Sequence, residues 1–126
     1  MKKEFVNKAK EKLTFEEYEV IVEKGTERPF SGKYDDFFEK GTYHCKLCDV
    51  KLFDSSDKFS IGCGWPSFSF AKGVDFKEDL SHGMIRKEVV CSTCGAHLGH
   101  VFDDGPLPSG KRFCINSICL NFVSDR

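Results

Sequence analysis

Seven cysteines carry most of the chemistry that this 126-residue sequence offers. Four of them form two C-x-x-C pairs, Cys45-Lys-Leu-Cys48 and Cys91-Ser-Thr-Cys94, which are separated by 42 residues. Each pair can present two thiolates from a tight turn, and two such turns complete a tetrahedral Zn²⁺ site. A site of four sulfurs leaves no open position for a substrate. We therefore expect one structural zinc per chain, with iron as the alternative ion for the same ligands.

Two independent thiol–disulfide motifs are the alternative interpretation of these pairs. A redox motif of the thioredoxin type stands at the start of a helix, and neither CKLCDVKLF nor CSTCGAHLG has the pattern of a helix. Cysteines of a cytosolic protein usually serve metal binding or catalysis instead of structural disulfides. Metal binding is therefore the favoured interpretation.

Two of the three remaining cysteines lie in KRFCINSICL, residues 111–120, which has the pattern of a strand. Side chains alternate between the faces of a strand. One face is then polar and the other apolar: Arg112, Cys114 and Asn116 on the first, and Phe113, Ile115 and Cys119 on the second. We therefore expect Cys119 in the core and Cys114 at a site, where Arg112 would favour its thiolate.

Two further stretches carry groups suited to a site. His97-Leu-Gly-His100 directly follows the second cysteine pair, so a bound metal would hold it rigidly. No carboxylate or cysteine pattern completes a second metal site around these histidines. Gly62-Cys63-Gly64-Trp65 places the last thiol in a glycine-flexible loop beside the only tryptophan. An exposed indole is a platform for an apolar or sulfur-containing group, whereas a buried one is a lid over the core.

The elements that must position these residues are short. The spacing of Phe5, Ala9 and Leu13 predicts an N-terminal helix, and Thr14 with Glu17 forms the capping box of a second helix over residues 14–23. A loop over residues 26–36 follows. The strands that we expect are Tyr43–Cys45, Val50–Phe53, Met84–Val90, Val101–Phe102 and Lys111–Val123.

The order of these elements indicates the fold class. Strands do not alternate with long helices, so a parallel sheet is not expected. The sequence predicts a mainly β fold with two antiparallel sheets around a structural zinc site and short N-terminal helices. We expect a single domain over residues 1–126, in which residues 1–40 supply the helices and a loop that wraps over the core.

Composition excludes several classes of function. A net charge of −1 with no basic stripe disfavours nucleic-acid binding, including that of a zinc ribbon. No apolar run approaches the ~20 residues of a membrane span, and the start MKKEFVNKAKEKL lacks the apolar core of a secretory signal. We therefore expect a cytoplasmic protein.

In combination, these stretches resemble the type-B methionine-R-sulfoxide reductases. The matching segments are LTFEEYEVIVEKGTERPFSGKY, GTYHCKLC, KLFDSSDKF, GCGWPSF, SHGMIRKEVVCSTCGAHLGHVFDDGP and SGKRFCINS. They extend from about residue 12 to residue 123. The resemblance implies a repair enzyme that reduces the R epimer of methionine sulfoxide, free or protein-bound, to methionine.

The resemblance also implies a role for each site residue. Cys114 would attack the sulfoxide sulfur and become a sulfenic acid, which Cys63 would convert to a disulfide that thioredoxin reduces. The donors of hydrogen bonds to the sulfoxide oxygen would be His97, His100 and Asn116, with Arg112 nearby. The substrate contacts would be Trp65, Asp104 and Phe113. The zinc ligands would be Cys45, Cys48, Cys91 and Cys94. Asp104 is expected to position a histidine or the substrate.

Two alternatives stay open at this point. A zinc-stabilised β domain that binds a partner without catalysis would explain the four paired cysteines, because fold does not fix function. It would leave Cys63, Trp65 and the histidines unexplained. Cys119 stands where the family usually has a small residue, so a back-up resolving thiol is the alternative to its place in the core.

Overall fold

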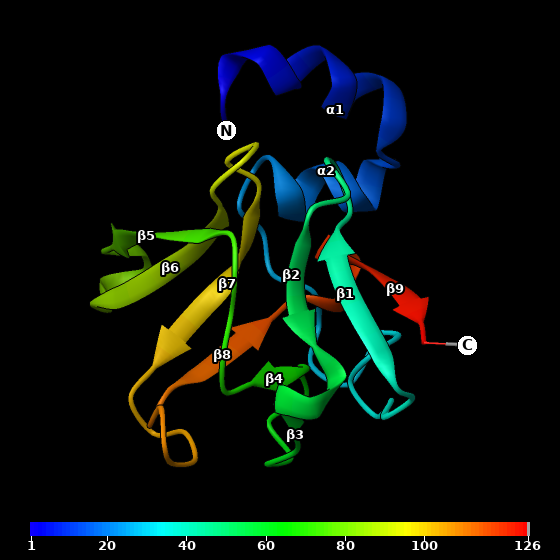
Figure 1. The fold of residues 1–126 in the computed structure, drawn as a ribbon. Coiled ribbons are helices and arrows are strands. Elements are labelled where there is room, and N and C mark those ends of the chain that lie inside the picture. Colours follow the sequence, from blue (N-terminus) through cyan, green and yellow to red (C-terminus); the bar gives the residue numbers. More distant parts are fainter. Residues whose placement is uncertain (126) are drawn as a thin grey trace.

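The computed structural model describes residues 1–125 and contains two helices and nine strands within that range (Figure 1). The helices are α1 (Val6–Lys12) and α2 (Phe15–Ile21). The strands are β1 (Gly41–Cys45), β2 (Lys51–Asp54), β3 (Lys58–Phe59), β4 (Ser67–Phe68), β5 (Val74–Asp79), β6 (Arg86–Cys91), β7 (His97–Phe102), β8 (Arg112–Ile115) and β9 (Leu120–Ser124).

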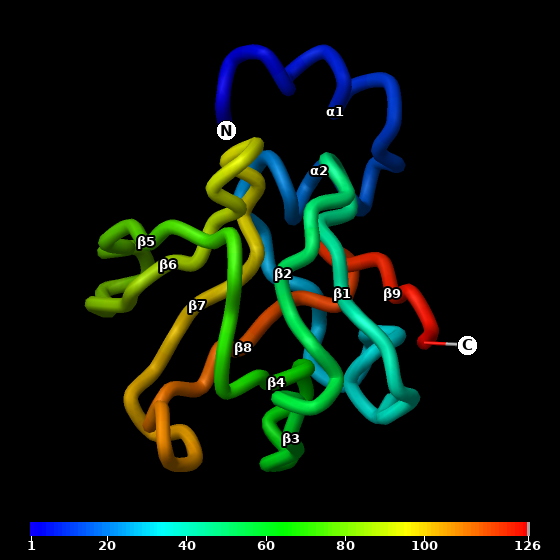
Figure 2. The backbone as a smooth tube through the Cα atoms, in the orientation of Figure 1, coloured from blue at the N-terminus to red at the C-terminus, as the bar shows by residue number. Residues whose placement is uncertain are grey.

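The strands form two antiparallel sheets. One has three strands in the order β2-β1-β9, and the other has six in the order β3-β4-β8-β7-β6-β5. Figure 2 shows the two sheets facing each other, with both helices at one end of the molecule. The predicted fold class is therefore confirmed.

The helices begin where their sequence signals predict. The Thr14 side chain accepts a hydrogen bond from the Glu17 amide, and Glu17 accepts one from the Thr14 amide, which is the expected capping box. α2 ends at Ile21 instead of residue 23, because Lys24 adopts a left-handed conformation with φ of 62°. The backbone amide of Lys2 donates to the carbonyl of Cys94, so the N-terminus is fastened to the second cysteine turn.

The core is one buried cluster that includes residues of both helices and both sheets. Phe53 of β2 stacks on Phe68 of β4 with ring centroids 4.3 Å apart, and Tyr43 of β1 meets Phe68 edge-on at 5.0 Å. Burial of each such ring stabilises the fold by about 1.5–3 kcal/mol. These contacts hold the small sheet against the large one.

The predicted strands differ from the observed ones in several places. The short strands β3 and β4 were not predicted, and β7 begins at His97 instead of Val101. The single strand predicted over residues 111–123 is two strands, because a 3-10 turn at Ser117–Cys119 ends β8 and sends β9 into the other sheet. β5 was not predicted, since DFKED has no alternation: this edge strand is mostly exposed. Among residues 1–125, no helix has the length and apolar character that crossing a membrane requires.

Candidate active site and metal centre

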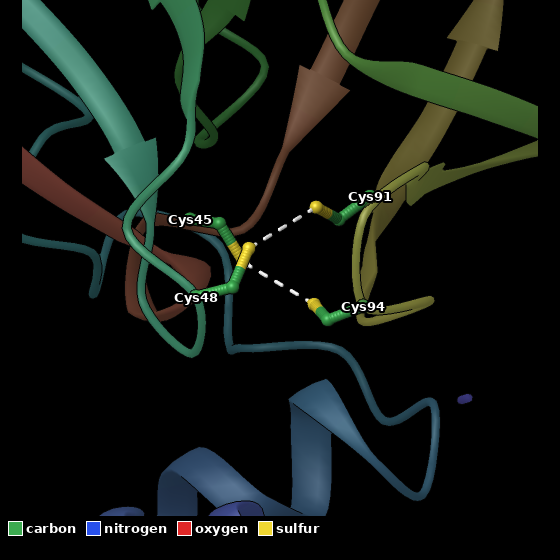
Figure 3. Close-up of side chains that lie close together, drawn as sticks. All are labelled: Cys45, Cys48, Cys91 and Cys94. Atoms are coloured by element: carbon green, nitrogen blue, oxygen red, sulfur yellow. Dashed lines mark hydrogen bonds between the residues drawn. The ribbon is translucent and has the colours of Figure 1, made fainter. Parts of the chain in front are cut away.

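The four paired cysteines converge at one point (Figure 3). All four sulfurs lie within 4.8 Å of one another. The Sγ atoms of Cys45 and Cys94 are 3.7 Å apart, and those of Cys48 and Cys91 are 3.6 Å apart. A tetrahedral ion with metal–sulfur bonds of about 2.3 Å has ligand sulfurs about 3.8 Å apart. The residues present therefore fit a closed, four-sulfur metal site.

The metal centre joins the two sheets. Cys45 is the last residue of β1 in the three-stranded sheet, and Cys91 is the last residue of β6 in the six-stranded sheet. The turn after β1 also touches the first helix, since Lys12 Nζ donates to the carbonyl of Leu47 at 3.0 Å. A bound ion would thus fasten the two layers together at this end, in addition to their side-chain contacts.

A second group of predicted residues lines a hollow of about 260 Å³ on the opposite side of the large sheet from the core. The wall comprises Thr26, Cys63, Trp65, Arg86, Gly99, His100, Phe102, Arg112, Cys114 and Asn116. Six of these residues were predicted from the sequence, and they come from three separate segments of the chain. Thr26, Arg86, Gly99 and Phe102 were not predicted.

Strand register explains how the hollow is built. Cys114 of β8 lies opposite His100 of β7 on one side and opposite Ser67 of β4 on the other. Residues paired in this way point to the same face of a sheet. The Cys63 thiol lies 3.5 Å from the Ser67 hydroxyl and donates to the carbonyl of Trp65 at 3.3 Å. Both thiols therefore face one hollow, next to His100.

A β-bulge brings His97 to the same face as His100. Three residues apart, the two side chains would point to opposite faces of a regular strand. In β7, however, Val89 pairs with Gly99 and Val90 pairs with His97, so Leu98 is an extra residue. The bulge turns His97 over, and the two imidazole rings lie 5.6 Å apart between centroids. Sequence spacing alone did not show this.

Glycine is required inside this bulged strand. A Cβ atom at Gly99 would lie 2.1 Å from the carbonyl oxygen of Cys114. The backbones of β7 and β8 can therefore approach closely only with glycine at this position. That close approach sets His100 beside Cys114.

Each histidine has a carboxylate partner that the sequence did not reveal. His97 Nδ1 lies 2.7 Å from Glu88 Oε2, and His100 Nε2 lies 2.7 Å from Asp79 Oδ2. Hydrogen bonds from Ser81 and His100 hold the pKa of Asp79 well below its usual range. Burial lowers the pKa of His97, against the effect of Glu88.

The surroundings of the Cys114 thiol favour the protonated form, whereas its neighbour Arg112 predicted the thiolate. Burial is the main cause that raises the pKa of Cys114 to about 12, and Cys63 adds to it. Arg112 acts in the opposite direction but is outweighed. Its guanidinium donates to both carboxylate oxygens of Asp104, at 2.8 and 3.2 Å, which compensates much of its charge.

Alkylation of Cys114 should therefore be slow and strongly dependent on pH. The thiolate is the reactive form, so we expect the rate with iodoacetamide at pH 7.5 to be at least about 100-fold below that of a free thiol. It should rise about tenfold per pH unit up to pH 10. Peptide mapping after timed alkylation measures this rate.

A variant tests the cause of that slow reaction. Cys63→Ser removes the second contribution to the raised pKa of Cys114, so its alkylation profile should move to lower pH. A rate for Cys114 in the native protein that is already constant below pH 7 would contradict the protonated thiol.

The loop before the first strand holds two site residues in place. Trp65 Nε1 donates to the carbonyl of Glu27 at 3.0 Å, and the Glu27 amide donates to Asn116 Oδ1 at 3.0 Å. Asn116 Nδ2 also donates to the carbonyl of Leu98 at 3.1 Å. One N–H of the Asn116 amide is left for a ligand in the hollow. Sequence reasoning described this segment only as a loop over the core.

Two predicted substrate contacts are not in the wall of the hollow. Phe113 is buried on the core face of β8, where its ring lies 6.3 Å from that of Phe53. Strand alternation explains this position, because its neighbour Cys114 faces the hollow. Asp104 is exposed and pairs with Arg112, so its hydrogen bonds go to the arginine and not to a histidine. The ring of Phe102 lines the hollow instead.

Cys119 lies in the core, as predicted, although it belongs to the 3-10 turn after β8 and not to a strand. Its thiol is 1 % exposed and donates to the carbonyl of His97 at 3.2 Å. We expect Cys119→Ala to keep turnover with thioredoxin and to lower the free energy of unfolding by only about 1 kcal/mol. Steady-state assays and urea unfolding measure both quantities. Loss of turnover in a folded Cys119→Ala protein would instead show that this thiol takes part in the reaction.

Comparison with known proteins covers almost the whole chain. Residues 13–124 match the model of the SelR domain. The chain belongs to the SelR domain family. It is 59 % identical over 117 residues to a peptide methionine sulfoxide reductase MsrB of Pseudomonas syringae pv. syringae, with 90 % of this chain and 89 % of that protein covered.

Relatives from more distant organisms carry the same description. A peptide methionine sulfoxide reductase MsrB of Teredinibacter turnerae is 54 % identical over 118 residues, covering 91 % of this chain and 87 % of that protein. A peptide methionine sulfoxide reductase MsrB of Methanosarcina barkeri is 56 % identical over 119 residues, covering 92 % of this chain and 84 % of that protein. The family predicted from the motifs is therefore confirmed, and within the SelR domain the hollow around Cys114 is the candidate active site.

Proposed function

We propose that this chain reduces the R epimer of methionine sulfoxide to methionine, with Cys114 as the nucleophile. The observation that carries the proposal is the meeting of two thiols and an imidazole in one hollow: Cys114 faces it between His100 and Ser67, and Cys63 borders the same hollow. The relatives named peptide methionine sulfoxide reductase support the same substrate class.

The first step transfers oxygen from the substrate to Cys114. The Cys114 sulfur attacks the sulfoxide sulfur and forms a transient S–S bond. The oxygen then passes to the Cys114 sulfur, so the S–O bond of the substrate and the transient S–S bond break, methionine leaves and Cys114 becomes a sulfenic acid. The thiol proton and the oxygen both end on the enzyme, so atoms and electrons balance. The sulfoxide oxygen must gain a proton as the bond breaks, and His100 lies opposite Cys114 in the sheet, in position to supply it.

The second step forms a disulfide and water. The Cys63 thiol attacks the sulfenic sulfur of Cys114, and the hydroxyl leaves as water. Gly62 adopts a φ of 73° and a Cβ atom there would meet nothing within 4 Å, so the loop before Cys63 has room to move. Thioredoxin is the proposed reductant, since exchange of its dithiol with the exposed side of the Cys63–Cys114 disulfide restores both thiols.

Aromatic side chains suit the substrate's methyl group. Trp65 is half-buried and is held by its hydrogen bond to Glu27, so one face of the indole remains available at the hollow. Sulfur and methyl groups pack favourably on aromatic rings. We infer that Trp65, with Phe102, receives the S-methyl group, while Arg112 and Asn116 border the polar side of the hollow.

The metal, the domain and the location complete the proposal. Zinc is the proposed ion at Cys45, Cys48, Cys91 and Cys94, because four thiolates at tetrahedral spacing are typical of structural zinc sites. One continuous core supports a single reductase domain over the chain. A cytoplasmic location suits seven cysteines that must stay reduced or metal-bound.

Stoichiometry in the absence of reductant tests the function directly. The reduced, metal-loaded protein is mixed with excess R-epimer methionine sulfoxide, and free thiols, released methionine and disulfide peptides are measured. We expect the loss of two thiols per chain as a Cys63–Cys114 disulfide, with about one methionine released. No reaction with the R epimer, in a folded protein with its metal, would favour a binding domain without catalysis.

A further inference from the structure

Two carboxylates stand behind the two histidines of the site, on the same face of the six-stranded sheet as Cys114. Glu88 of β6 lies opposite His100 in the register of β6 and β7, and Asp79 closes β5 next to Arg86. The two carboxylates, however, bind different ring nitrogens. Glu88 is bound to Nδ1 of His97, and Asp79 to Nε2 of His100.

His100 lines the hollow and is bound to Asp79 through Nε2, which leaves Nδ1 as its second ring nitrogen. A carboxylate only accepts hydrogen bonds, so Nε2 of His100 must carry a proton when it lies 2.7 Å from Asp79. Asp79 is itself fixed by the Ser81 amide, which donates to its Oδ1 at 3.0 Å, and by Arg86 at 3.4 Å from Oδ2. This carboxylate therefore stabilises positive charge on the ring when Nδ1 also binds a proton.

His97 has the opposite arrangement. Its Nδ1 donates to Glu88, so its Nε2 is the nitrogen without a proton when the ring is neutral. Nε2 is buried and makes no hydrogen bond to any residue among 1–125. The side chain is 3 % exposed, and this burial favours the uncharged ring. A buried imidazole nitrogen without a proton is a hydrogen-bond acceptor, so Nε2 of His97 requires a donor within the site.

We propose that Asp79 and Glu88 are positioning residues that give the two histidines opposite hydrogen-bonding roles. Asp79 orients His100 and stabilises its charged form, so that His100 donates a proton to the sulfoxide oxygen. Glu88 fixes the proton of His97 on Nδ1 and burial keeps this ring neutral, so that its Nε2 is an acceptor. This changes the role of donor that the family resemblance implied for His97. This inference rests on the proposed function.

The charged neighbours fit this division. Lys24 Nζ lies 3.5 Å from the second oxygen of Glu88, and Arg86 lies next to Asp79. The cation at Glu88 lies at the oxygen away from His97, whereas Arg86 lies at the same oxygen of Asp79 that binds His100. A second hollow, lined in part by Glu88 and His97, lies beside the hollow around Cys114. The two share Thr26, Arg86 and His100, so the two histidines belong to one continuous site.

Nitrogen-15 NMR of the imidazole rings tests the arrangement in the wild-type protein. The metal-loaded, reduced chain is labelled on histidine and measured at a pH where both rings are neutral. We expect His100 to carry its proton on Nε2 and His97 to carry its proton on Nδ1. The same tautomer at both residues, or the reverse assignment, would overturn the proposal without reference to activity or to any variant.

A charge-removing variant tests the consequence for catalysis. In Asp79→Asn we expect kcat for R-sulfoxide reduction to fall about 10- to 100-fold, with KM changed less than about threefold. Asp79→Glu should restore most of the rate. Asp75→Asn removes an exposed carboxylate from the same face of β5 and should behave as wild type.

The outcomes separate this inference from the proposed function. An Asp79→Asn protein with wild-type kcat, or one whose lost rate Asp79→Glu does not restore, would overturn the role of Asp79. If that variant does not fold, the tautomers of the wild-type protein decide the question. A wild-type protein without reductase activity would refute the proposed function, while the NMR measurement would still report which nitrogens the two carboxylates hold.

Discussion

Replacing Cys114 by serine is expected to reduce turnover of R-epimer methionine sulfoxide by at least about 10³-fold, because a hydroxyl is a far weaker nucleophile than a thiol at this sulfur. The fold should be unaffected, since the side chain faces the hollow and not the core. Steady-state assays with thioredoxin, together with thermal unfolding, measure both effects. Cys119→Ala is the matched control, because it removes a thiol from the same segment but from the core face.

Replacing Cys63 should give a different kinetic signature. Cys63→Ser should release about one methionine per chain and then stop with thioredoxin, because the Cys114 sulfenic acid has no internal partner. A small thiol such as dithiothreitol should restore turnover, since it can attack the sulfenic acid directly. Equal turnover of Cys63→Ser and wild type with thioredoxin would remove Cys63 as the resolving residue. Substantial turnover by Cys114→Ser would remove the nucleophile itself.

Loss of the metal is expected to destabilise the fold by several kcal/mol. Binding of structural zinc contributes about 10–16 kcal/mol in zinc-finger peptides, whereas a whole domain is stable by only about 5–15 kcal/mol. In this chain the four ligands connect the end of β1 to the end of β6, and so connect the two sheets. Chelation under mild denaturing conditions should therefore lower the melting temperature sharply, with the metal content measured by elemental analysis.

A ligand variant gives the same test without a chelator. Cys91→Ser removes one of the four sulfurs and should lose the ion and much of the stability, while Cys119→Ser, which changes an equally buried cysteine outside the cluster, should keep the ion. An unchanged melting curve after verified metal loss would show that the side-chain core alone holds the sheets together. Elemental analysis of the native protein also distinguishes zinc from iron.

The spacing of residues along the chain was sufficient to predict many of the residues that form this site. Two residues between cysteines suffice to predict a metal turn, and the meeting of the two turns follows from the chemistry of a tetrahedral ion. Alternation along residues 112–115 places Arg112 and Cys114 in the hollow and Phe113 and Ile115 in the core, as the structure confirms. The same alternation also explains why Phe113, for which the family resemblance suggested a substrate contact, lies on the core face and not in the wall of the hollow.

The predictions from the sequence were wrong where a strand departs from regular geometry and where burial sets the pKa of a side chain. The strand over residues 111–123 was expected to continue, but the turn at Ser117–Cys119 carries the chain from one sheet to the other. The thiolate of Cys114 was expected from its neighbour Arg112 in the sequence. The pKa of its thiol depends instead on burial, on Cys63 from a distant loop, and on Arg112, whose charge is shared with Asp104.

The sequence by itself determined the family, the metal ligands, the two thiols of the site and the mainly β fold, because these depend on residue types at short spacings. Only the tertiary structure decided which groups surround those thiols. The bulge at Leu98 turns His97 to the face of His100, and strands β5 and β6 bring Asp79 and Glu88 to the two rings. Such contacts join residues far apart in the chain, so strand register and burial fix them, and no local pattern records either.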